Sequence, residues 1–323
     1  MRSFIVNSSQ SGEHVVKACS MQFPALKNAD LYRALKHKDI RIDGKKVSSD
    51  ITVYEDQEVQ VWLPDSLFDA AVDSSAKSPA KKSSMDDYRV VAQTDSLLIL
   101  NKRQGLAVHS GATTEENLID IVRRQSKFRD AELVHRIDMN TGGLILVAKN
   151  KAALEDAVAL FKKDLVIKRY RCLVVGRIPA DIGEPVVCTD EALMCEINSY
   201  LEKTKSGSVY IHDERKDGDL PISTRYRVLG YYNGFSEIEC ELITGRTHQI
   251  RAQFAHLGYP ILGDGNYGRN QVNLGFRNKE GGKIRHQQLW STSLIFGKIP
   301  VDNMHRELSG RKFSIEPSYE VEL

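Results

Sequence analysis

The sequence predicts an α+β protein in two parts, a small unit followed by a large domain. Segments with the alternation or short apolar runs of β-strands outnumber those with helical spacing, and they recur through the second part. A stretch rich in Ala, Ser and Asp, without a periodic apolar face, separates the two parts. We therefore expect a small unit at residues 1–65, a flexible linker at residues 66–85 and a large domain at residues 86–323.

Composition predicts a cytoplasmic protein with no membrane partner. The chain has 323 residues, of which 41% are hydrophobic and 27% charged, and its formal net charge is +2. No apolar run is long enough to span a bilayer, and the first residues lack the apolar segment of a signal peptide. The 5 cysteines show no CxxC spacing, so the sequence predicts neither disulfides nor a zinc site. Any basic surface must be local, because the net charge is small.

The small unit is predicted to hold a helix followed by a basic hairpin. Residues 29–36 have apolar residues at helical spacing, and residues 39–47 alternate around an Asp43–Gly44 turn, the strongest short signal for a hairpin. Residues 53–63 alternate as a further strand. This order resembles the S4 RNA-binding domain.

The S4 resemblance implies a set of basic side chains facing RNA phosphates. These are Arg33, Lys36, Arg41, Lys45 and Lys46. The alternative is an ordinary solvated face, since Asp30, Asp39 and Asp43 dilute the positive charge.

The large domain reads mainly as strands, with a few helices between them. We expect strands at residues 88–93, 96–102, 166–175, 223–229 and 237–243, a loop returning into a strand at 105–109, helices at 117–124, 151–163 and 247–256, and a polar excursion at 182–222 with short strands around Val186 and Val209.

One stretch of the large domain, HRIDMNTGGLILVAKN at residues 135–150, predicts a strand, a loop and a strand. Asp138 lies at the start of the loop, and Gly142 and Gly143 are expected to let the backbone turn tightly before the apolar run. Taken alone, Arg136 and Asp138 are also what a surface ion pair beside a glycine turn would look like.

Three segments together resemble one enzyme family. HRIDMNTGGLILVAK (residues 135–149) looks like the active-site motif of the RluA family of pseudouridine synthases, and KRYRCLVVG (168–176) is similar to that family's tyrosine-bearing strand. GRTHQIRAQFAHLGYPILGDGNYG (245–268) resembles its third motif almost residue for residue. The chain departs from the family at Arg103–Gln104, where a proline is usual, and we expect this to alter loop stiffness more than chemistry.

The resemblance implies a fold and a chemistry for residues 86–323. The fold is a bent, mixed, mostly antiparallel sheet with flanking helices and a catalytic cleft across it. The reaction turns uridine into pseudouridine in RNA and needs no cofactor or metal. Asp138 would act on the ribose, as a nucleophile at C1′ or by assisting elimination to a glycal. Arg251 would orient Asp138 and stabilise its ionised form, Tyr170 would stack on uracil and serve as the late base, and Ile250 would pack against the uracil pocket.

A uridine inside folded RNA must leave its stack to reach such a pocket, at a cost of about a few kcal/mol. The resemblance assigns Arg136 to filling the vacated space or holding the phosphate. The alternative for Arg136 is a second ion pair with Asp138.

These motifs do not specify which class of RNA is the substrate. An S4-like unit suits large structured RNA, so we expect large-subunit ribosomal RNA rather than tRNA, acted on by a monomer. One rival function is a non-catalytic RNA-binding or ribosome-assembly protein, which would have no reason to hold Asp138, Tyr170 and Arg251 together. A glycoside hydrolase is disfavoured because it generally needs two paired carboxylates.

Overall fold

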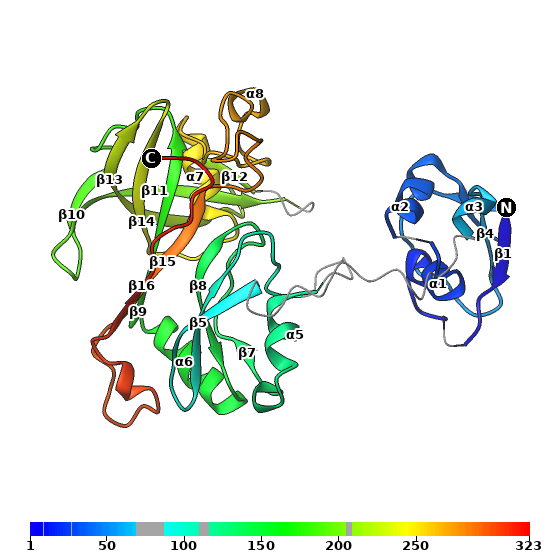
Figure 1. Ribbon diagram of the computed structural model, residues 1–323, viewed down its shortest axis with the longest axis horizontal. Helices are drawn as coiled ribbons and strands as arrows, with labels where there is room; N and C mark the ends of the chain where they lie inside the picture. Colours follow the sequence, from blue (N-terminus) through cyan, green and yellow to red (C-terminus); the bar gives the residue numbers. More distant parts are fainter. Residues whose placement is uncertain (9, 27, 69–86, 110–115, 205–208) are drawn as a thin grey trace. The chain divides into compact units, whose positions relative to one another are not determined.

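The computed structural model describes residues 1–8, 10–26, 28–68, 87–109, 116–204 and 209–323. The chain forms two compact units, Met1–Lys81 and Lys82–Leu323 (Figure 1). No helix among the described residues is both long and apolar enough to cross a membrane.

The small unit is a four-stranded antiparallel sheet covered by helices. The strand order is β1-β4-β2-β3. The elements are β1 (Arg2–Ile5), α1 (Val15–Gln22), α2 (Asn28–His37), β2 (Ile40–Ile42), β3 (Lys45–Val47), β4 (Glu58–Val61) and α3 (Asp65–Phe68). The predicted hairpin is confirmed: Asp43 and Gly44 have φ of 49° and 75°, the positive values that a tight two-residue hairpin turn requires.

Two predictions for the small unit need correction. The strand expected at residues 53–63 is limited to β4, because Val53 and its neighbours form a loop with a single bridge to His14. The linker expected at residues 66–85 begins too early. Phe68 is buried, and its ring packs edge-on against Phe23 at 5.1 Å, so α3 belongs to the small unit. One short turn carries too few apolar residues to show a period. The rest of the predicted linker lies outside the described residues.

A mixed, mostly antiparallel sheet organises the large unit, which confirms the predicted fold class. Its path is β10-β11-β13-β14-β9-β15-β8-β6-β5. The strands are β5 (Tyr88–Gln93), β6 (Leu97–Lys102), β7 (Glu132–Leu133), β8 (Gly142–Ala148), β9 (Val166–Val175), β10 (Glu184–Val187), β11 (Leu193–Lys203), β12 (Val209–His212), β13 (Leu220–Tyr232), β14 (Phe235–Leu242), β15 (Leu289–Phe296) and β16 (Lys312–Ser314). β7, β12 and β16 pair with β8, β11 and β15, off the main path.

β15 joins the two halves of this sheet. It pairs antiparallel with β9 and parallel with β8. The expected Thr-Gly-Gly turn is not formed, because Gly142 and Gly143 open β8 and lie against β15 instead. A Cβ on Gly142 would lie 2.6 Å from the Trp290 ring, and a Cβ on Gly143 would lie 2.2 Å from the Ser291 carbonyl oxygen. These glycines therefore permit close strand contact rather than a turn.

Helices cover the sheet: α5 (Leu118–Arg123), α6 (Lys151–Lys162), α7 (Gln249–His256) and α8 (Asn270–Asn273), with 3-10 turns at Ser126–Phe128 and Arg306–Leu308. α6 is preceded by its N-cap Asn150, whose side chain accepts the Ala153 N–H, and its apolar face packs on β8 in a buried cluster. The strand expected at residues 105–109 is not formed, and this segment is a loop.

The alternation of side chains along β9 points Tyr170 toward the core. Arg169 and Arg171 face one side of the sheet, where they pair with Glu241 and Glu237 of β14. Because successive strand residues point to opposite faces, Tyr170 faces the main apolar core.

Candidate active site

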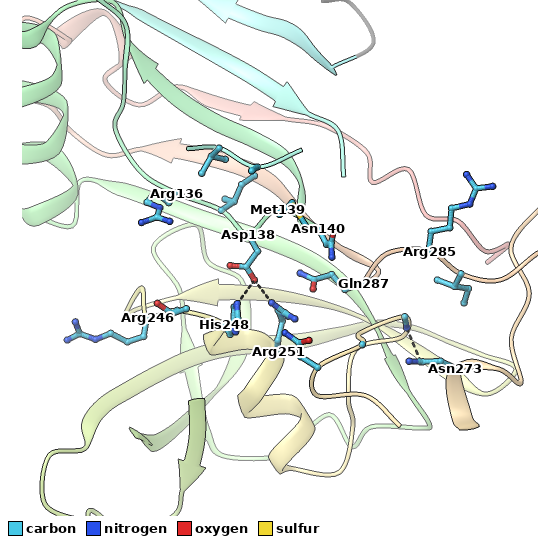
Figure 2. Close-up of a pocket in the computed structure, with 18 of the residues that line it drawn as sticks. Arg136, Asp138, Met139, Asn140, Arg246, His248, Arg251, Asn273, Arg285 and Gln287 are labelled. Atoms are coloured by element: carbon cyan, nitrogen blue, oxygen red, sulfur yellow. Dashed lines mark hydrogen bonds and ion pairs between the residues drawn. The ribbon is translucent and has the colours of Figure 1, made fainter. Parts of the chain in front are cut away.

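Asp138 lies in the loop between β7 and β8, at the wall of a large cavity. Its side chain is 28% exposed, so the carboxylate can meet a ligand while remaining partly enclosed. The cavity measures about 980 Å³ and is lined from three parts of the chain, residues 107–109, 136–140 and 245–287. Figure 2 shows Asp138 with Arg251 and His248 beneath it.

Arg251, in the first turn of α7, links two carboxylates. Its guanidinium donates to Asp138 Oδ2 at 2.8 Å, and to Asp264 Oδ2 and Oδ1 at 2.7 and 3.1 Å. Although burial opposes the charged form, the hydrogen bonds and charge of Asp264 and then the charge of Asp138 raise the pKa of Arg251. The sequence prediction that Arg251 and Asp138 lie together is therefore matched by the geometry, across 113 residues of chain.

Asp264 was not predicted as a site residue, although it stands in the third motif. It is fully buried, and its Oδ1 accepts the backbone N–H groups of Asn266 and Tyr267. Burial acts to raise the pKa of Asp264, but the bonds and charge of Arg251 outweigh it and lower the pKa. Asp264 thus fixes the angle at which Arg251 meets Asp138.

His248 caps the start of α7 in a left-handed conformation, with φ of 54°. Its Nδ1 lies 2.9 Å from the Tyr267 hydroxyl, and its Nε2 lies 3.9 Å from Asp138 Oδ2. Burial lowers the pKa of His248, with the Asp138 charge acting against that change. The helix expected from Thr247 accordingly begins two residues later, at Gln249.

A smaller cavity of about 90 Å³ opens beside Asp138, and Asp138 lines both cavities. Tyr170, Ile250 and Leu289 line it, and all three are buried. Burial raises the pKa of Tyr170 well above its usual range, and the negative charge of Asp138 raises it further. This chamber combines apolar side chains, a phenol and one carboxylate with cations such as Lys168 and Arg251, which suits a flat ring attached to a sugar.

Arg136 is exposed and lines both cavities. Among the described residues, Asp138 forms an ion pair with Arg251 and lies 3.9 Å from His248 Nε2, and it forms no ion pair with Arg136. The geometry therefore disfavours the alternative in which Arg136 is a second ion-pair partner of Asp138.

The Asp138 loop, residues 134–141, is fixed by side chains that the sequence did not single out. Lys102 is fully buried, and its Nζ donates to the carbonyls of Arg103, Leu106 and Met139. Burial lowers the pKa of Lys102 to about 7, and the charge of Arg103 acts in the same direction. Gln104 donates to the carbonyls of Asn140 and Gln287 at 3.0 and 2.6 Å. Its amide thus cross-links the Asp138 loop to the segment before β15.

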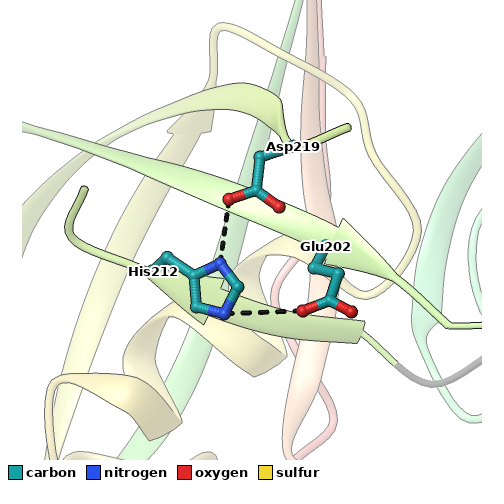
Figure 3. A group of neighbouring side chains, drawn as sticks. All are labelled: Glu202, His212 and Asp219. Atoms are coloured by element: carbon teal, nitrogen blue, oxygen red, sulfur yellow. Dashed lines mark hydrogen bonds and ion pairs between the residues drawn. The ribbon is translucent and has the colours of Figure 1, made fainter. Parts of the chain in front are cut away.

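One group of potential metal ligands occurs among the described residues: Glu202, His212 and Asp219. Figure 3 shows the imidazole between the two carboxylates, with Nδ1 2.8 Å from Asp219 and Nε2 3.5 Å from Glu202. The carboxylates thus face opposite ring nitrogens, and Lys216 Nζ lies 3.1 Å from Nε2. This arrangement ties β12 to β11 and β13 and does not converge on one ion.

The basic residues predicted for RNA contact in the small unit lie on α2 and the hairpin. Lys36, Lys45 and Lys46 are exposed. Arg33 pairs with Asp30 at 3.1 Å, and the Arg41 guanidinium lies 4.9 Å from the Trp62 ring centroid.

Comparison with known proteins gives a family. A family model described as RNA pseudouridylate synthase matches residues 96–256, which include Asp138, Tyr170 and Arg251. The chain is 32% identical over 259 residues to the ribosomal large subunit pseudouridine synthase C of Rickettsia conorii, covering 77% of this chain and 80% of that protein. The protein of the same name from Vibrio cholerae is 30% identical over 266 residues, covering 81% of this chain and 79% of the relative.

A solved structure agrees at the level of fold. Human RNA pseudouridylate synthase domain containing 1 superposes with a TM-score of 0.51 at 24% identity, covering 67% of this chain and 79% of that one. The sequence relatives confirm the family that the three motifs predicted. The chain belongs to the RNA pseudouridylate synthase family.

Proposed function

We propose that this pseudouridine synthase modifies uridines of large-subunit ribosomal RNA and that Asp138 is its catalytic carboxylate. One observation carries the assignment of the site: Asp138, held by Arg251, lines both the large cavity and the small one that Tyr170 and Ile250 line. The RNA assignment rests on the names of the relatives, which are ribosomal large subunit pseudouridine synthases.

The two cavities suit the two parts of the substrate. The RNA strand occupies the large cavity, and the flipped uracil enters the small one, where it stacks on Tyr170 and packs against Ile250. Its ribose then lies at the junction beside Asp138. Arg136 lines this junction and fills the space that the base leaves or holds its phosphate.

The reaction breaks the N1–C1′ bond, turns the uracil and joins C5 to C1′. A proton leaves C5 and N1 gains one, so atoms and electrons balance within the nucleotide. Asp138 enters the reaction as an anion oriented by Arg251. Whether it attacks C1′ or removes a ribose proton, its negative charge disappears in that step.

Loss of the Asp138 charge removes one cause of the raised pKa of Tyr170. The Asp138 charge is the second cause of the raised pKa of Tyr170, after burial. Once Asp138 is neutral, the phenol releases its proton to solvent more readily, and N1 of the uracil later takes a proton from solvent. We infer that the Tyr170 phenolate removes the C5 proton after the glycosidic step, which restores the phenol.

Tyr170→Phe should therefore slow the reaction by about 10²-fold, the usual contribution of a general base. The wild-type single-turnover rate should rise with pH from about pH 7 to 10, because more of a high-pKa phenol is ionised as the pH increases. The phenylalanine variant should lose this rise. A variant with the wild-type rate and pH profile would leave Tyr170 with stacking alone.

The RNA target is tested by mapping. Ribosomal RNA and tRNA from cells lacking the gene and from their parent are treated with carbodiimide and read by primer extension. We expect specific stops to disappear from large-subunit RNA and to return when the gene is restored. Loss of tRNA stops instead would assign the enzyme to tRNA, and no change in any RNA would favour a non-catalytic RNA-binding role.

We also propose that the small unit is S4-like and binds RNA through Arg33, Lys36, Arg41, Lys45 and Lys46. Its helix followed by a basic hairpin supports this. Deleting residues 1–85 should weaken binding to protein-free ribosomal RNA and flatten the dependence of affinity on salt, since phosphate contacts are lost. An unchanged affinity and salt slope would remove the S4 assignment.

A further inference from the structure

The large cavity has a second basic wall, far along the chain from Asp138. Lys283 and Arg285, in the segment between α8 and β15, line it, and both are exposed. Figure 2 shows Arg136 and Arg285 on opposite sides of Asp138. A strand of RNA lying in this cavity with its uridine at Asp138 would therefore meet a cation on each side.

The two cationic side chains of this wall are not used in ion pairs with the described residues. Arginines of the sheet, such as Arg171, Arg225 and Arg227, pair with glutamates. Among the residues that the structure describes, neither Lys283 nor Arg285 has an ion-pair partner. Positive side chains left unpaired in a cavity favour a polyanion, and phosphate contacts supply much of the affinity of proteins for nucleic acid.

A single carboxylate holds the backbone of this wall. Glu320 accepts the N–H groups of Arg285 and His286 at 2.8 and 3.1 Å, and its Oε1 lies 2.9 Å from His286 Nδ1. Its own N–H donates to Gln288 Oε1 at 2.7 Å, and its carbonyl accepts the Lys279 N–H at 2.7 Å.

The segment that carries Glu320 is itself anchored. Tyr319 and Val321, its two neighbours, are buried in a cluster with Leu262 and Trp290. The backbone of the basic wall is thus attached to the core through Glu320. Preorganisation reduces the entropy that ordering a loop would cost on binding.

We propose that Lys283 and Arg285 bind phosphates of the RNA strand on the side of the target uridine opposite Arg136, and that Glu320 is a positioning residue for this subsite. The inference rests on the proposed function. A flipped nucleotide stays connected to the RNA only through its two neighbours. Protein contacts to phosphates on both sides therefore keep the strand in place while the base is out of its stack.

The test measures the affinity of the full-length protein for protein-free ribosomal RNA, prepared from cells lacking the gene, over a series of salt concentrations. Arg285→Ala and Lys283→Ala should each weaken binding several-fold and reduce the slope of log affinity against log salt by about 1. Lys298→Ala, an exposed lysine that lines neither cavity, is the matched control and should change neither quantity. Slopes equal to wild type in both cavity variants would overturn the subsite.

Glu320→Ala separates positioning from simple charge. Removing a negative charge beside a phosphate site should tighten binding if only the net charge matters. If Glu320 positions the wall, the alanine variant should bind several-fold more weakly, and Glu320→Gln, which keeps one acceptor oxygen, should recover part of the loss. A thermal melt close to wild type shows that the variants are folded, and tighter or unchanged binding would overturn the positioning role.

Failure of this inference is distinct from failure of the proposed function. If the wild-type protein forms pseudouridine but the salt slopes do not change in the variants, only the subsite is wrong. If the wild-type protein forms none, the proposed function fails whatever the slopes show.

Discussion

Asp138→Asn will abolish pseudouridine formation while RNA binding is retained. The amide keeps the size of the carboxylate but has no negative charge for the ribose step and offers Arg251 only its carbonyl oxygen. We expect the single-turnover rate to fall by at least about 10⁴-fold, which is the size of loss seen when an essential catalytic residue is removed from an enzyme. The measurement is carbodiimide mapping of ribosomal RNA incubated with purified protein.

The control measurement for Asp138→Asn is its affinity for RNA. Asp138 is 28% exposed and lies beside several cations, so losing its charge should leave RNA affinity unchanged or slightly higher. An asparagine variant that still modifies RNA at a rate near wild type would show that Asp138 is not the catalytic group. A variant that has lost both activity and binding would show that its effect is structural.

Arg251→Met should cost both activity and stability. The substitution leaves Asp264, which is fully buried, without its cation, and it frees Asp138 to rotate. Breaking a buried ion pair by removing one partner costs about 3–5 kcal/mol, so we expect a loss of that size in the free energy of unfolding. Urea denaturation and single-turnover rates measure the two effects.

A second substitution separates these two effects. In the Arg251→Met, Asp264→Asn double variant no carboxylate is left uncompensated at position 264, so much of the lost stability should return. Activity should not return, because Asp138 still lacks its partner. If the double variant regained activity, Arg251 would act only by neutralising Asp264, and its proposed role in orienting Asp138 would be wrong.

Sequence pattern predicted several local elements of the large unit, but not β15 or β16. β9 has the predicted bounds, and α6 differs from its prediction by one residue, because each carries an unbroken period. Within the excursion at residues 182–222, β10 and β12 agree with the expected short strands. β11 was missed because its register is set by pairing with β13 rather than by a clear alternation of its own.

The pairing of Asp138 with Arg251 came from a resemblance to a family and not from spacing. No local rule brings together two residues 113 positions apart. Lys102, Gln104 and Glu320 were missed for the same reason. Each acts through backbone carbonyls or N–H groups, which every residue possesses and which therefore leave no mark in the sequence.

The position of β15 has a consequence for how the enzyme is made. Asp138 belongs to the half of the sheet that ends at β8, while Tyr170 and the strands leading to Arg251 belong to the half that begins at β9. A ribosome synthesises both halves before it reaches residues 289–296, the strand that joins them. We therefore expect a nascent chain to have no assembled site until that strand has left the exit tunnel, so newly made enzyme gains activity in one late step.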